Sequence, residues 1–438
     1  MAVTAREVTL RCMLAGEKQG AWSDGYLRNT IGKAGLSGRD AALCTLLTYG
    51  ILQNRMLLDW HIDRLSSVPS GDMEPVVKNC LRMGLYQLGF MDRVPPHAAV
   101  NESVALAKRQ ARNPKAAGLV NAVLRTFERE QATGVPQPEE LSIRYSHPQW
   151  LVDEFLDSLP KDEVERLLEA DNGSAPTEAQ VNTIKTTAEA LREELSEQGV
   201  EAVPHPWLPN CLELENTGDL TALPAFQEGR FYIQDAAAKL AVMAAAPSPG
   251  ARVLDTCAAP GGKSFASAIA MGDKGEIISC DIHAHKMKLI AAGRDRLGLG
   301  CIRTELLDAR TFRPEWESAF DVVITDVPCS GLGVIRKKPD IRYKASTPLE
   351  GLPKIQMDIL SNAASYVRPG GTLLYATCTL LRRENQDVVQ RFLEKEKGFY
   401  LTPFQLPAPI GTVEEGMLTL WPHRHGTDGF FIAKMTRK

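Results

Sequence analysis

The stretch Val253–Ser264 reads Val-Leu-Asp-Thr-Cys-Ala-Ala-Pro-Gly-Gly-Lys-Ser and decides the fold of the last part of the chain. Its apolar residues up to Asp255 predict a short strand that ends in a carboxylate. The pair Gly261-Gly262 predicts a tight turn, and Lys263–Ala270 predicts a helix. A strand, a glycine turn and a helix start form the opening unit of a nucleotide-type site, because glycines let the backbone approach a ligand and the first helical N–H groups attract anions.

A second carboxylate stands at the end of the next expected strand. This strand, Glu276–Asp281, ends 26 residues after Asp255, and an acidic side chain there suits the two hydroxyls of a ribose. If the small residues only packed a strand against a helix, there would be no need for a carboxylate at the end of each of these two strands. The chain contains neither G-x-G-x-x-G nor G-x-x-x-x-G-K-[ST], so the usual dinucleotide-binding and P-loop interpretations are weak.

Strands and helices alternate through the rest of this region, which predicts a parallel, doubly wound sheet. The expected strands are Ala251–Asp255, Glu276–Asp281, Cys301–Leu306, Phe320–Asp326 and Thr372–Thr377, with final strands near Leu418–Trp421 and Phe430–Ala433. Ligands gather beyond the carboxyl ends of such strands. The polar residues that fall at these ends are Asp255, Asp281, Asp308, Asp326 and Thr377-Cys378.

Two cysteines follow neighbouring expected strands. Cys329 lies in Asp326-Val-Pro-Cys-Ser, and Cys378 lies in Ala376-Thr-Cys-Thr. Isolated cysteines are commonly buried and inert, which suits most of the other seven. Cysteines at adjacent strand ends can instead face one pocket, where a thiolate acts as a nucleophile. Spacing alone does not decide which of the two would attack.

Composition places the chain among ordinary globular proteins. It has 438 residues, 44% hydrophobic and 24% charged, which is enough for two or three domains. No apolar run is long enough to cross a membrane, and the first residues lack the apolar core of a signal peptide. The nine cysteines are scattered without zinc-type spacing, so we expect a reducing, cytoplasmic compartment and no metal.

The domain organisation follows from helical periodicity and charge. Residues 1–135 read as a helical domain, and residues 1–130 carry 17 Lys/Arg against 12 Asp/Glu. Residues 145–228 read as a small α+β domain, and most of it, residues 151–230, is strongly acidic, with 5 against 18. Residues 229–438 form the third domain. The basic flanks are compatible with a polyanionic partner, although ordinary solvated faces fit the charge equally well.

Several motifs together resemble one known family. Asp255–Ser264 is similar to the S-adenosylmethionine (SAM) loop of RNA cytosine-5 methyltransferases, and the two cysteine motifs with Glu384-Asn385 resemble that group's paired motifs. The segment Ala117–Arg125 is similar to the last helix of the NusB-like RNA-binding fold. The chain as a whole resembles the Fmu/Sun (RsmB) family, which methylates 16S ribosomal RNA. Gln180 stands where that family usually has Arg, and Val327 where it usually has Ala.

The resemblance implies a set of site residues. It implies that Cys378 is the nucleophile, that Cys329 assists product release, and that Asp326 contacts the target base. DNA cytosine-5 methyltransferases instead use a Pro-Cys nucleophile, which would favour Cys329. The residues implied for SAM binding are Asp255, Cys257, Ala258, Ala259, Pro260, Gly261, Gly262, Lys263, Asp281, Asp308 and Asp326. The cations that flank the cysteine motifs and are expected to contact RNA phosphates are Arg336, Lys337, Lys338, Arg382 and Arg383.

The expected function is therefore SAM-dependent methylation of C5 of a cytosine in 16S rRNA, through a covalent cysteine–C6 adduct, by a cytoplasmic monomer. The expected fold is an all-α NusB-like domain, a small α+β domain and a Rossmann-like class I methyltransferase domain. The same chemistry on tRNA or DNA is the first alternative. A non-catalytic RNA-binding assembly factor is the second, and the presence of both cysteines and the whole SAM loop counts against it.

Overall fold

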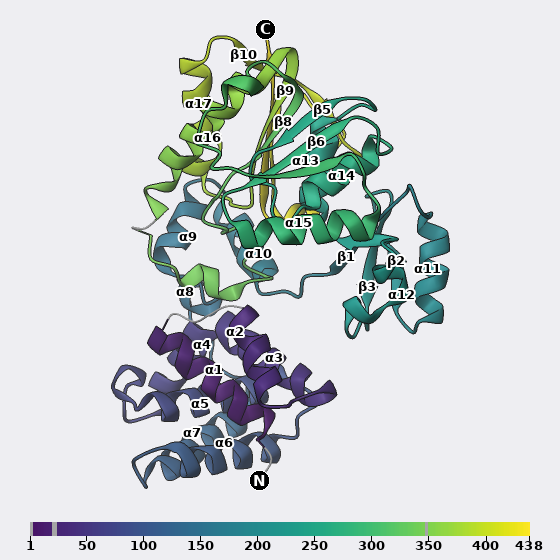
Figure 1. Cartoon of the computed structure of the whole chain (residues 1–438). Helices are drawn as coiled ribbons and strands as arrows, with labels where there is room; N and C mark the ends of the chain where they lie inside the picture. Colours follow the sequence, from purple (N-terminus) through teal and green to yellow (C-terminus); the bar gives the residue numbers. More distant parts are fainter. Residues whose placement is uncertain (1–2, 20–23, 347–348) are drawn as a thin grey trace. The chain divides into compact units, whose positions relative to one another are not determined.

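A computed structural model describes residues 3–19, 24–346 and 349–438. The chain divides into two compact units (Figure 1). One unit holds the described residues up to Asn172 together with Lys338–Lys344. The other holds Gly173–Lys337 and the described residues from Ala345 to Lys438. In the described part of the chain, no helix is both long and apolar enough to cross a membrane.

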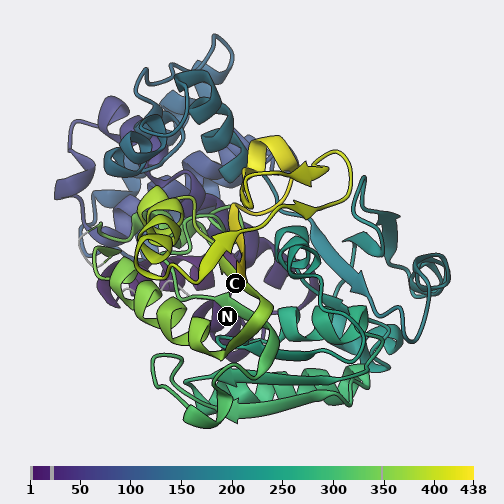
Figure 2. The ribbon, with the colours of Figure 1, turned by 90° about the horizontal axis from the view of Figure 1, so that it is seen from above.

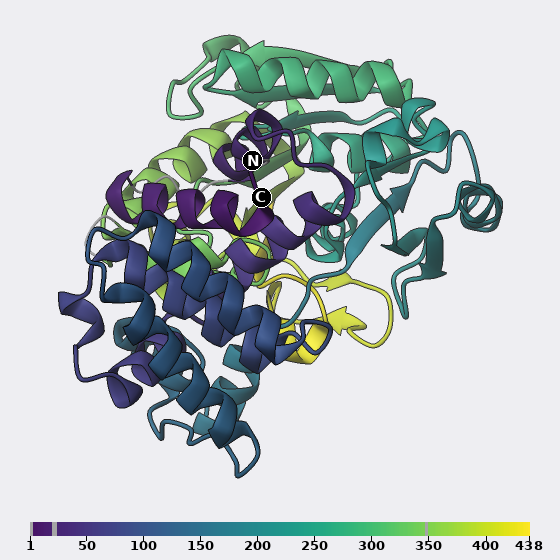
Figure 3. The same cartoon turned by 90° about the horizontal axis from the view of Figure 1, so that it is seen from below.

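The first unit is built from helices (Figure 3), and its buried apolar side chains form a large cluster and a smaller one that includes Val8 and Cys44. Helix α5 supplies the largest number of its buried residues. The helices are α1 (Ala5–Gln19), α2 (Asp24–Lys33), α3 (Gly38–Gln53), α4 (Arg55–Leu65), α5 (Pro75–Phe90), α6 (Pro96–Gln110), α7 (Ala116–Gln131), α8 (Leu141–Arg144), α9 (Gln149–Leu156) and α10 (Lys161–Asp171). Helices α9 and α10, which fall within residues 145–228 and were expected in the second domain, lie within this unit.

Two helical predictions differ from the structure. The sequence from Ala41 to His61 has apolar residues at helical spacing and predicts one continuous helix, but Asn54 separates α3 from α4. The side-chain Nδ2 of Asn54 donates to the carbonyl of Gly50 at 2.9 Å, so this side chain satisfies the end of α3. Helix α2 was not expected, because its ten residues carry a weak apolar pattern.

The second unit begins with a four-stranded antiparallel sheet in the order β2-β3-β1-β4. Its strands are β1 (Thr177–Val181), β2 (Glu201–Pro204), β3 (Cys211–Glu215) and β4 (Phe231–Ile233), with helices α11 (Ala188–Glu197) and α12 (Pro224–Gln227). The stretch Val181-Asn182-Thr183 predicts a short strand, but β1 begins four residues earlier, because Ala179 and Val181 fill the apolar core of this sheet. The sequence also missed β2 and β4, which are only four and three residues long.

The large sheet of the second unit has the order β10-β14-β9-β8-β5-β6-β7, with β13 beside β14. Its strands are β5 (Arg252–Asp255), β6 (Glu276–Asp281), β7 (Ile302–Leu306), β8 (Phe320–Asp326), β9 (Val367–Thr377), β10 (Phe399–Leu401), β13 (Met417–Leu420) and β14 (Phe430–Arg437). Strands β5 to β9 are parallel, and β14 pairs antiparallel with β9 (Figure 2). The chain reverses its direction of growth between β5 and β8, which is where such sheets bind ligands.

Helices cover both faces of this sheet (Figure 1). Alternate strand residues point to opposite faces: Val253 packs with one apolar cluster and Leu254 with another. The first cluster also takes residues from α13 (Ala236–Ala245), α14 (Gly262–Ala270) and α15 (Ala284–Leu297), and the second from α16 (Leu352–Tyr366) and α17 (Gln386–Lys395). The expected fold class, a helical domain, a small α+β domain and a doubly wound domain, is confirmed.

Candidate functional site at the ends of the parallel strands

The glycine turn after β5 adopts the conformation that its sequence predicts. Gly261 has φ = 113° and precedes α14, and an added Cβ there would lie 2.4 Å from the ring of Phe265. Only glycine fits this position without strain. The buried Asp255 carboxylate accepts a hydrogen bond from the Ser264 hydroxyl at 2.7 Å, which ties the end of β5 to the first turn of α14. Burial raises the pKa of Asp255 to about 6.

A cavity of about 330 Å³ opens beside this turn. Cys257, Asp281 and Asp308 line it together with apolar side chains that include Ile282 and Ile359. Asp281 is 8% exposed, and its Oδ1 accepts a hydrogen bond from the backbone N–H of His283 at 2.9 Å. This hydrogen bond fixes the orientation of the carboxylate and therefore of its second oxygen. Two carboxylates on the wall of a cavity with apolar side chains fit a nucleoside that has a ribose and a base amino group, and Asp308 is in addition paired with Arg310 at 2.6 Å.

The buried lysine of the turn meets the end of strand β8. Lys263 Nζ lies 2.5 Å from Asp326 Oδ2, and both side chains also line a second cavity of about 410 Å³. Burial opposes the charge on Lys263, but the ion pair with Asp326 outweighs it and raises the pKa of the lysine. Asp255 Oδ1 is buried without a hydrogen-bond partner and lines the same cavity. Unsatisfied buried oxygens of this kind mark a place for a polar ligand.

The two motif cysteines lie side by side. Cys329 follows β8, Cys378 follows β9, and their Sγ atoms are 3.2 Å apart. The contact with Cys378 is the largest cause that raises the pKa of Cys329 well above its ordinary value, and burial adds to it. Both thiols are half-buried, as is Cys257, whereas Cys12, Cys44, Cys80, Cys211 and Cys280 are fully buried. Adjacent strand ends therefore bring together the two cysteines that the motifs singled out.

Two residues that received no role from the sequence hold the cysteine loops. Glu384 and Asn385 are both fully buried directly behind the two thiols. Glu384 accepts a hydrogen bond from the N–H of Ser330, next to Cys329, and Asn385 bonds with residues on both sides of Cys378. Their place in the resembling motif was visible in the sequence. The task of Glu384 was not, because it depends on Ser330, which lies 54 residues earlier, whereas the partners of Asn385 lie only six and eight residues away in the chain.

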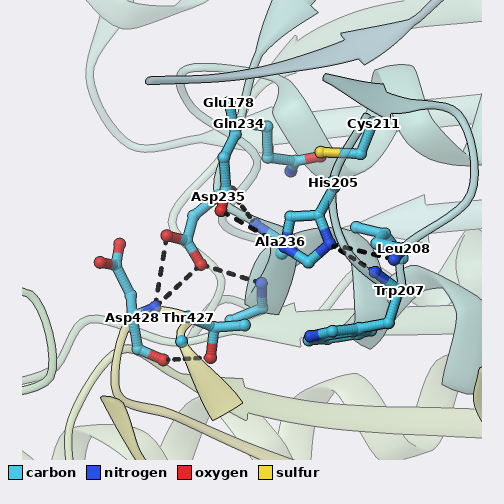
Figure 4. Close-up of polar contacts among 12 residues, drawn as sticks. Glu178, His205, Trp207, Leu208, Cys211, Gln234, Asp235, Ala236, Thr427 and Asp428 are labelled. Atoms are coloured by element: carbon cyan, nitrogen blue, oxygen red, sulfur yellow. Dashed lines mark hydrogen bonds and ion pairs between the residues drawn. The ribbon is translucent and has the colours of Figure 1, made fainter. Parts of the chain in front are cut away.

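The cations expected to bind RNA differ in their surroundings. The Arg336 side chain is 7% exposed and pairs with Asp428, while Lys337 Nζ contacts Asp235 at 2.5 Å and Asp428 at 2.8 Å. Asp235 also accepts a hydrogen bond from the N–H of Asp428 at 3.2 Å (Figure 4). A phosphate at these two cations would have to compete with two carboxylates.

The remaining three expected cations lie elsewhere on the surface. Lys338 is exposed and belongs to the first unit. The Arg382 side chain is 65% exposed and makes one ion pair, with Asp387 at 3.2 Å, and Arg383 is half-buried. Within the described ranges, no group of three or more His, Cys, Asp or Glu residues could hold a metal ion.

Family models cover most of the chain. The model described as 16S rRNA methyltransferase RsmB/F matches residues 242–436. The NusB family model matches residues 3–129, and the ferredoxin-like domain of RsmF/B-like methyltransferases matches residues 147–221. The three matched regions follow one another in the order of the three expected domains.

Individual relatives match over nearly the full length. The chain is 35% identical to the probable ribosomal RNA small subunit methyltransferase B of Bacillus subtilis, over 99% of both chains. It is 34% identical to the probable enzyme of the same name from Synechocystis, over 99% of this chain and 100% of the relative. The crystal structure of PH0851 covers 100% of both chains with a TM-score of 0.79 and 27% identity. The chain therefore belongs to the RsmB/F family of SAM-dependent 16S rRNA methyltransferases.

Proposed function

We propose that this protein methylates C5 of a cytosine in 16S rRNA, with Cys378 as the nucleophile and Cys329 as the group that completes the reaction. The observation that carries the proposal is the 3.2 Å contact between the two thiols, beside the Lys263–Asp326 pair at the carboxyl ends of the parallel strands. C5 of cytosine is a poor nucleophile until a group adds to C6, and a thiolate is suited to that addition.

The SAM-binding residues would be the glycine turn, Asp281 for the ribose and Asp308 for the base, together with Asp255 and Asp326. The bound cofactor supplies an electrophilic methyl group. The turn fits a bound ligand because Ala259, Pro260 and Gly262 line the second cavity, while the absence of a side chain on Gly261 makes room for the ring of Phe265. Cys257, Ala258, Ala259, Pro260, Gly262 and Lys263 line the second cavity and would contact the cofactor there.

The chain's own groups would carry out the remaining steps. The Cys378 thiolate forms a bond to C6, and C5 then takes the methyl group while Asp326 and Lys263 hold the base. A proton must next leave C5, after which the bond between Cys378 and C6 breaks and the thiolate departs. The target base must leave its stack to reach this site.

The contact between the two thiols determines at which point of the proposed reaction Cys329 ionises. The contact with Cys378 is the largest cause of the raised pKa of Cys329, so Cys329 keeps its proton while it faces the Cys378 thiolate that the proposed attack requires. Once Cys378 is bonded to C6, that charge is gone and the main cause of the raised pKa of Cys329 disappears. Cys329 can then pass its own proton to water, and the resulting thiolate can accept the proton from C5. The same residue thereby stabilises the attacking thiolate first and acts as a base afterwards.

A pair of variants tests these roles. With SAM and target RNA, Cys378→Ala should bind both and form neither adduct nor 5-methylcytosine. Cys329→Ala should attack, transfer the methyl group and stall as a denaturant-resistant protein–RNA complex. A gel and nucleoside mass spectrometry give both readouts. An adduct in Cys378→Ala and none in Cys329→Ala would reverse the assignment. Full turnover in both variants would rule out a thiol nucleophile, and product only with tRNA would change the substrate.

The expected RNA contacts can be ranked by exposure. Arg382 and Lys338 reach solvent, so Arg382→Ala and Lys338→Ala should each weaken RNA binding and lower the slope of log K against log salt by about 1. Arg336→Ala should change that slope less, because Asp428 already neutralises the guanidinium. Binding measured at several salt concentrations distinguishes the three variants. Equal slopes for Arg382→Ala, Lys338→Ala and the wild type would remove these two residues from the RNA surface.

A further inference from the structure

A buried dipeptide, Glu384-Asn385, lies between the two cysteine loops and the start of α17. Glu384 ends a short 3-10 turn (Arg382–Glu384), and α17 begins at Gln386. Both side chains are 0% exposed. Fully buried carboxylates and amides are unusual unless their hydrogen bonds are fulfilled, so the partners of these two side chains indicate what they do.

Asn385 forms hydrogen bonds with both chain neighbours of Cys378. Its Oδ1 accepts a hydrogen bond from the Thr377 hydroxyl at 2.6 Å, and its Nδ2 donates to the carbonyl of Thr379 at 2.9 Å. One amide group therefore fixes the residue before the cysteine and the residue after it. The Cα of Cys378 has little freedom left, and its thiol direction depends mainly on one side-chain rotation.

Glu384 does the same for Cys329, with the help of Gln356 from α16. Glu384 Oε2 accepts hydrogen bonds from the N–H of Ser330 at 2.9 Å and from Gln356 Nε2 at 2.8 Å. The same Gln356 Nε2 donates to the carbonyl of Pro328 at 3.1 Å. The residue before Cys329 and the residue after it are thus held by a single carboxylate–amide pair.

The hydrogen bonds around Cys378 and those around Cys329 are connected to each other. The Ser330 and Thr379 hydroxyls are hydrogen-bonded at 2.7 Å, which connects the loop of one cysteine to the loop of the other. The Tyr375 hydroxyl donates to the backbone carbonyl of Glu384 at 2.5 Å and ties the dipeptide to strand β9. The four flanking residues of the cysteines and the dipeptide form one continuous network, which is buried except at Pro328.

We propose that Glu384 and Asn385 are positioning residues that hold the Cys329 and Cys378 thiols in register for attack on the base and for release of the product. The inference rests on the proposed function. Hydrogen bonds that merely satisfied local backbone groups would not need to fall on both sides of each cysteine. A reacting atom displaced by about 1 Å loses roughly 100-fold in rate, so a network of this kind has a kinetic effect out of proportion to its contribution to folding.

Substitutions of Asn385 and of Glu384 should impair different steps of the reaction. Asn385 acts on the nucleophile loop, so its loss affects the first step, the bond from Cys378 to C6. Glu384 acts on the Cys329 loop, and its negative charge is also among the groups that favour the protonated thiol of Cys329. Glutamine in its place keeps one oxygen that can accept the bonds from Ser330 and Gln356 while it removes the charge. The Glu384→Gln variant therefore distinguishes the effect of these hydrogen bonds from the effect of the negative charge.

The first experiment measures single-turnover adduct formation in the full-length protein. Asn385→Ala should form the RNA adduct about 100-fold more slowly than the wild type, with unchanged SAM affinity. Gln386→Ala, one residue further along, removes a hydrogen bond to Thr419 and serves as the matched control, with a wild-type rate. Adduct formation by Asn385→Ala within about twofold of the control would overturn the positioning role of Asn385.

The second experiment follows the thiols without RNA. Alkylation of Cys329 by iodoacetamide, mapped by mass spectrometry against pH, should shift to lower pH in Glu384→Gln than in the wild type. Glu384→Ala also loses the hydrogen bonds to Ser330 and Gln356, so this variant should slow product release and accumulate adduct. An unshifted Cys329 profile in Glu384→Gln, together with normal release in Glu384→Ala, would exclude a role for Glu384.

A failure of the proposed function would look different. If the wild type itself forms no adduct and no 5-methylcytosine, the chemistry is wrong, whatever the variants do. The alkylation profiles remain informative in that case, because they report the positions of the two thiols in the free protein. If the wild type does form the adduct and Asn385→Ala forms it equally fast, only the positioning role fails.

Discussion

The Sγ atoms of Cys329 and Cys378 lie 3.2 Å apart at the ends of the neighbouring parallel strands β8 and β9. No other side chain separates them, so one thiol can react with the other once either is oxidised. Hydrogen peroxide converts one thiol to a sulfenic acid and releases water, and the second thiol then displaces a second water to form a disulfide. The arrangement that suits two-cysteine catalysis therefore also makes the site sensitive to peroxide.

We expect mild peroxide treatment to abolish methylation and to lower the protein mass by two hydrogen atoms, with both effects reversed by dithiothreitol. Cys329→Ser should lose this reversible mass change, whereas Cys301→Ala, which removes a half-buried thiol elsewhere, should retain it. Peptide mapping with an alkylating agent identifies the bridged pair. Finding both thiols still alkylatable after inactivation would contradict the prediction.

The second prediction concerns the carboxylate at the end of β6. Asp281→Ala should weaken SAM binding by about 1 kcal/mol or more, since the ribose hydroxyls lose their acceptor. The same substitution also removes the acceptor for the N–H of His283, so Asp281→Asn is needed to keep the turn while it removes the charge. Asp295→Ala, with a side chain 67% exposed on α15, is the control. Calorimetry gives the three affinities, and unchanged binding in a folded Asp281→Ala protein would remove this residue from the site.

The third prediction concerns pH and the buried acid of the small sheet. Burial and the neighbouring Asp235 carboxylate raise the pKa of Glu178 to about 8 from 4.5, and it also faces Lys337 and Asp428. His205 Nε2 lies 3.9 Å from Glu178 Oε1. Between pH 4.5 and about 8 the folded state holds the proton and the unfolded state does not. The free energy of unfolding therefore falls as the pH rises through that window.

Glu178→Gln removes this proton uptake. The melting temperature of the variant, compared with that of the wild type, should rise by about 3 °C or more between pH 5 and pH 8. Glu215→Gln, an exposed acid on the adjacent strand β3, should show no such trend. Thermal unfolding at several pH values provides the measurement. A constant difference between Glu178→Gln and the wild type across the range would mean that Glu178 is ionised in the folded protein at pH 5.

Local patterns predicted much of this structure, because the information lay within short stretches. The glycine turn, α14 and the acid-terminated strands β5 and β6 were all expected from consecutive residues. The short strands β2 and β4 were not, since four and three residues carry too little periodicity and are defined by their pairing. The network around Glu384 and Asn385 could not be predicted for the same reason. Its partners Ser330 and Gln356 come from loops and helices that only the fold brings together.

The segment Lys338–Lys344 is another feature that the sequence did not indicate. It lies shortly after the Cys329 motif in the chain, yet it packs within the first unit. Arg342 is 0% exposed, and its guanidinium donates to the carbonyls of Gln53 at 3.2 Å and Ser146 at 3.3 Å and to Asn172 Oδ1 at 2.7 Å. Basic residues near a catalytic motif suggest a nucleic-acid surface, but here a buried arginine instead fulfils the hydrogen-bonding capacity of helix ends and turns.

The last prediction follows from these contacts. Arg342→Ala leaves several buried carbonyls without donors and should lower the free energy of unfolding of the first unit by about 3 kcal/mol. Arg342→Lys should recover only part of that loss, because a single ammonium cannot reach the set of acceptors that a planar guanidinium serves. Arg166→Ala, with a side chain 58% exposed in the same unit, should stay within about 0.5 kcal/mol of the wild type. Urea unfolding gives all three values, and a loss for Arg342→Ala as small as that for Arg166→Ala would show that the segment does not hold the first unit together.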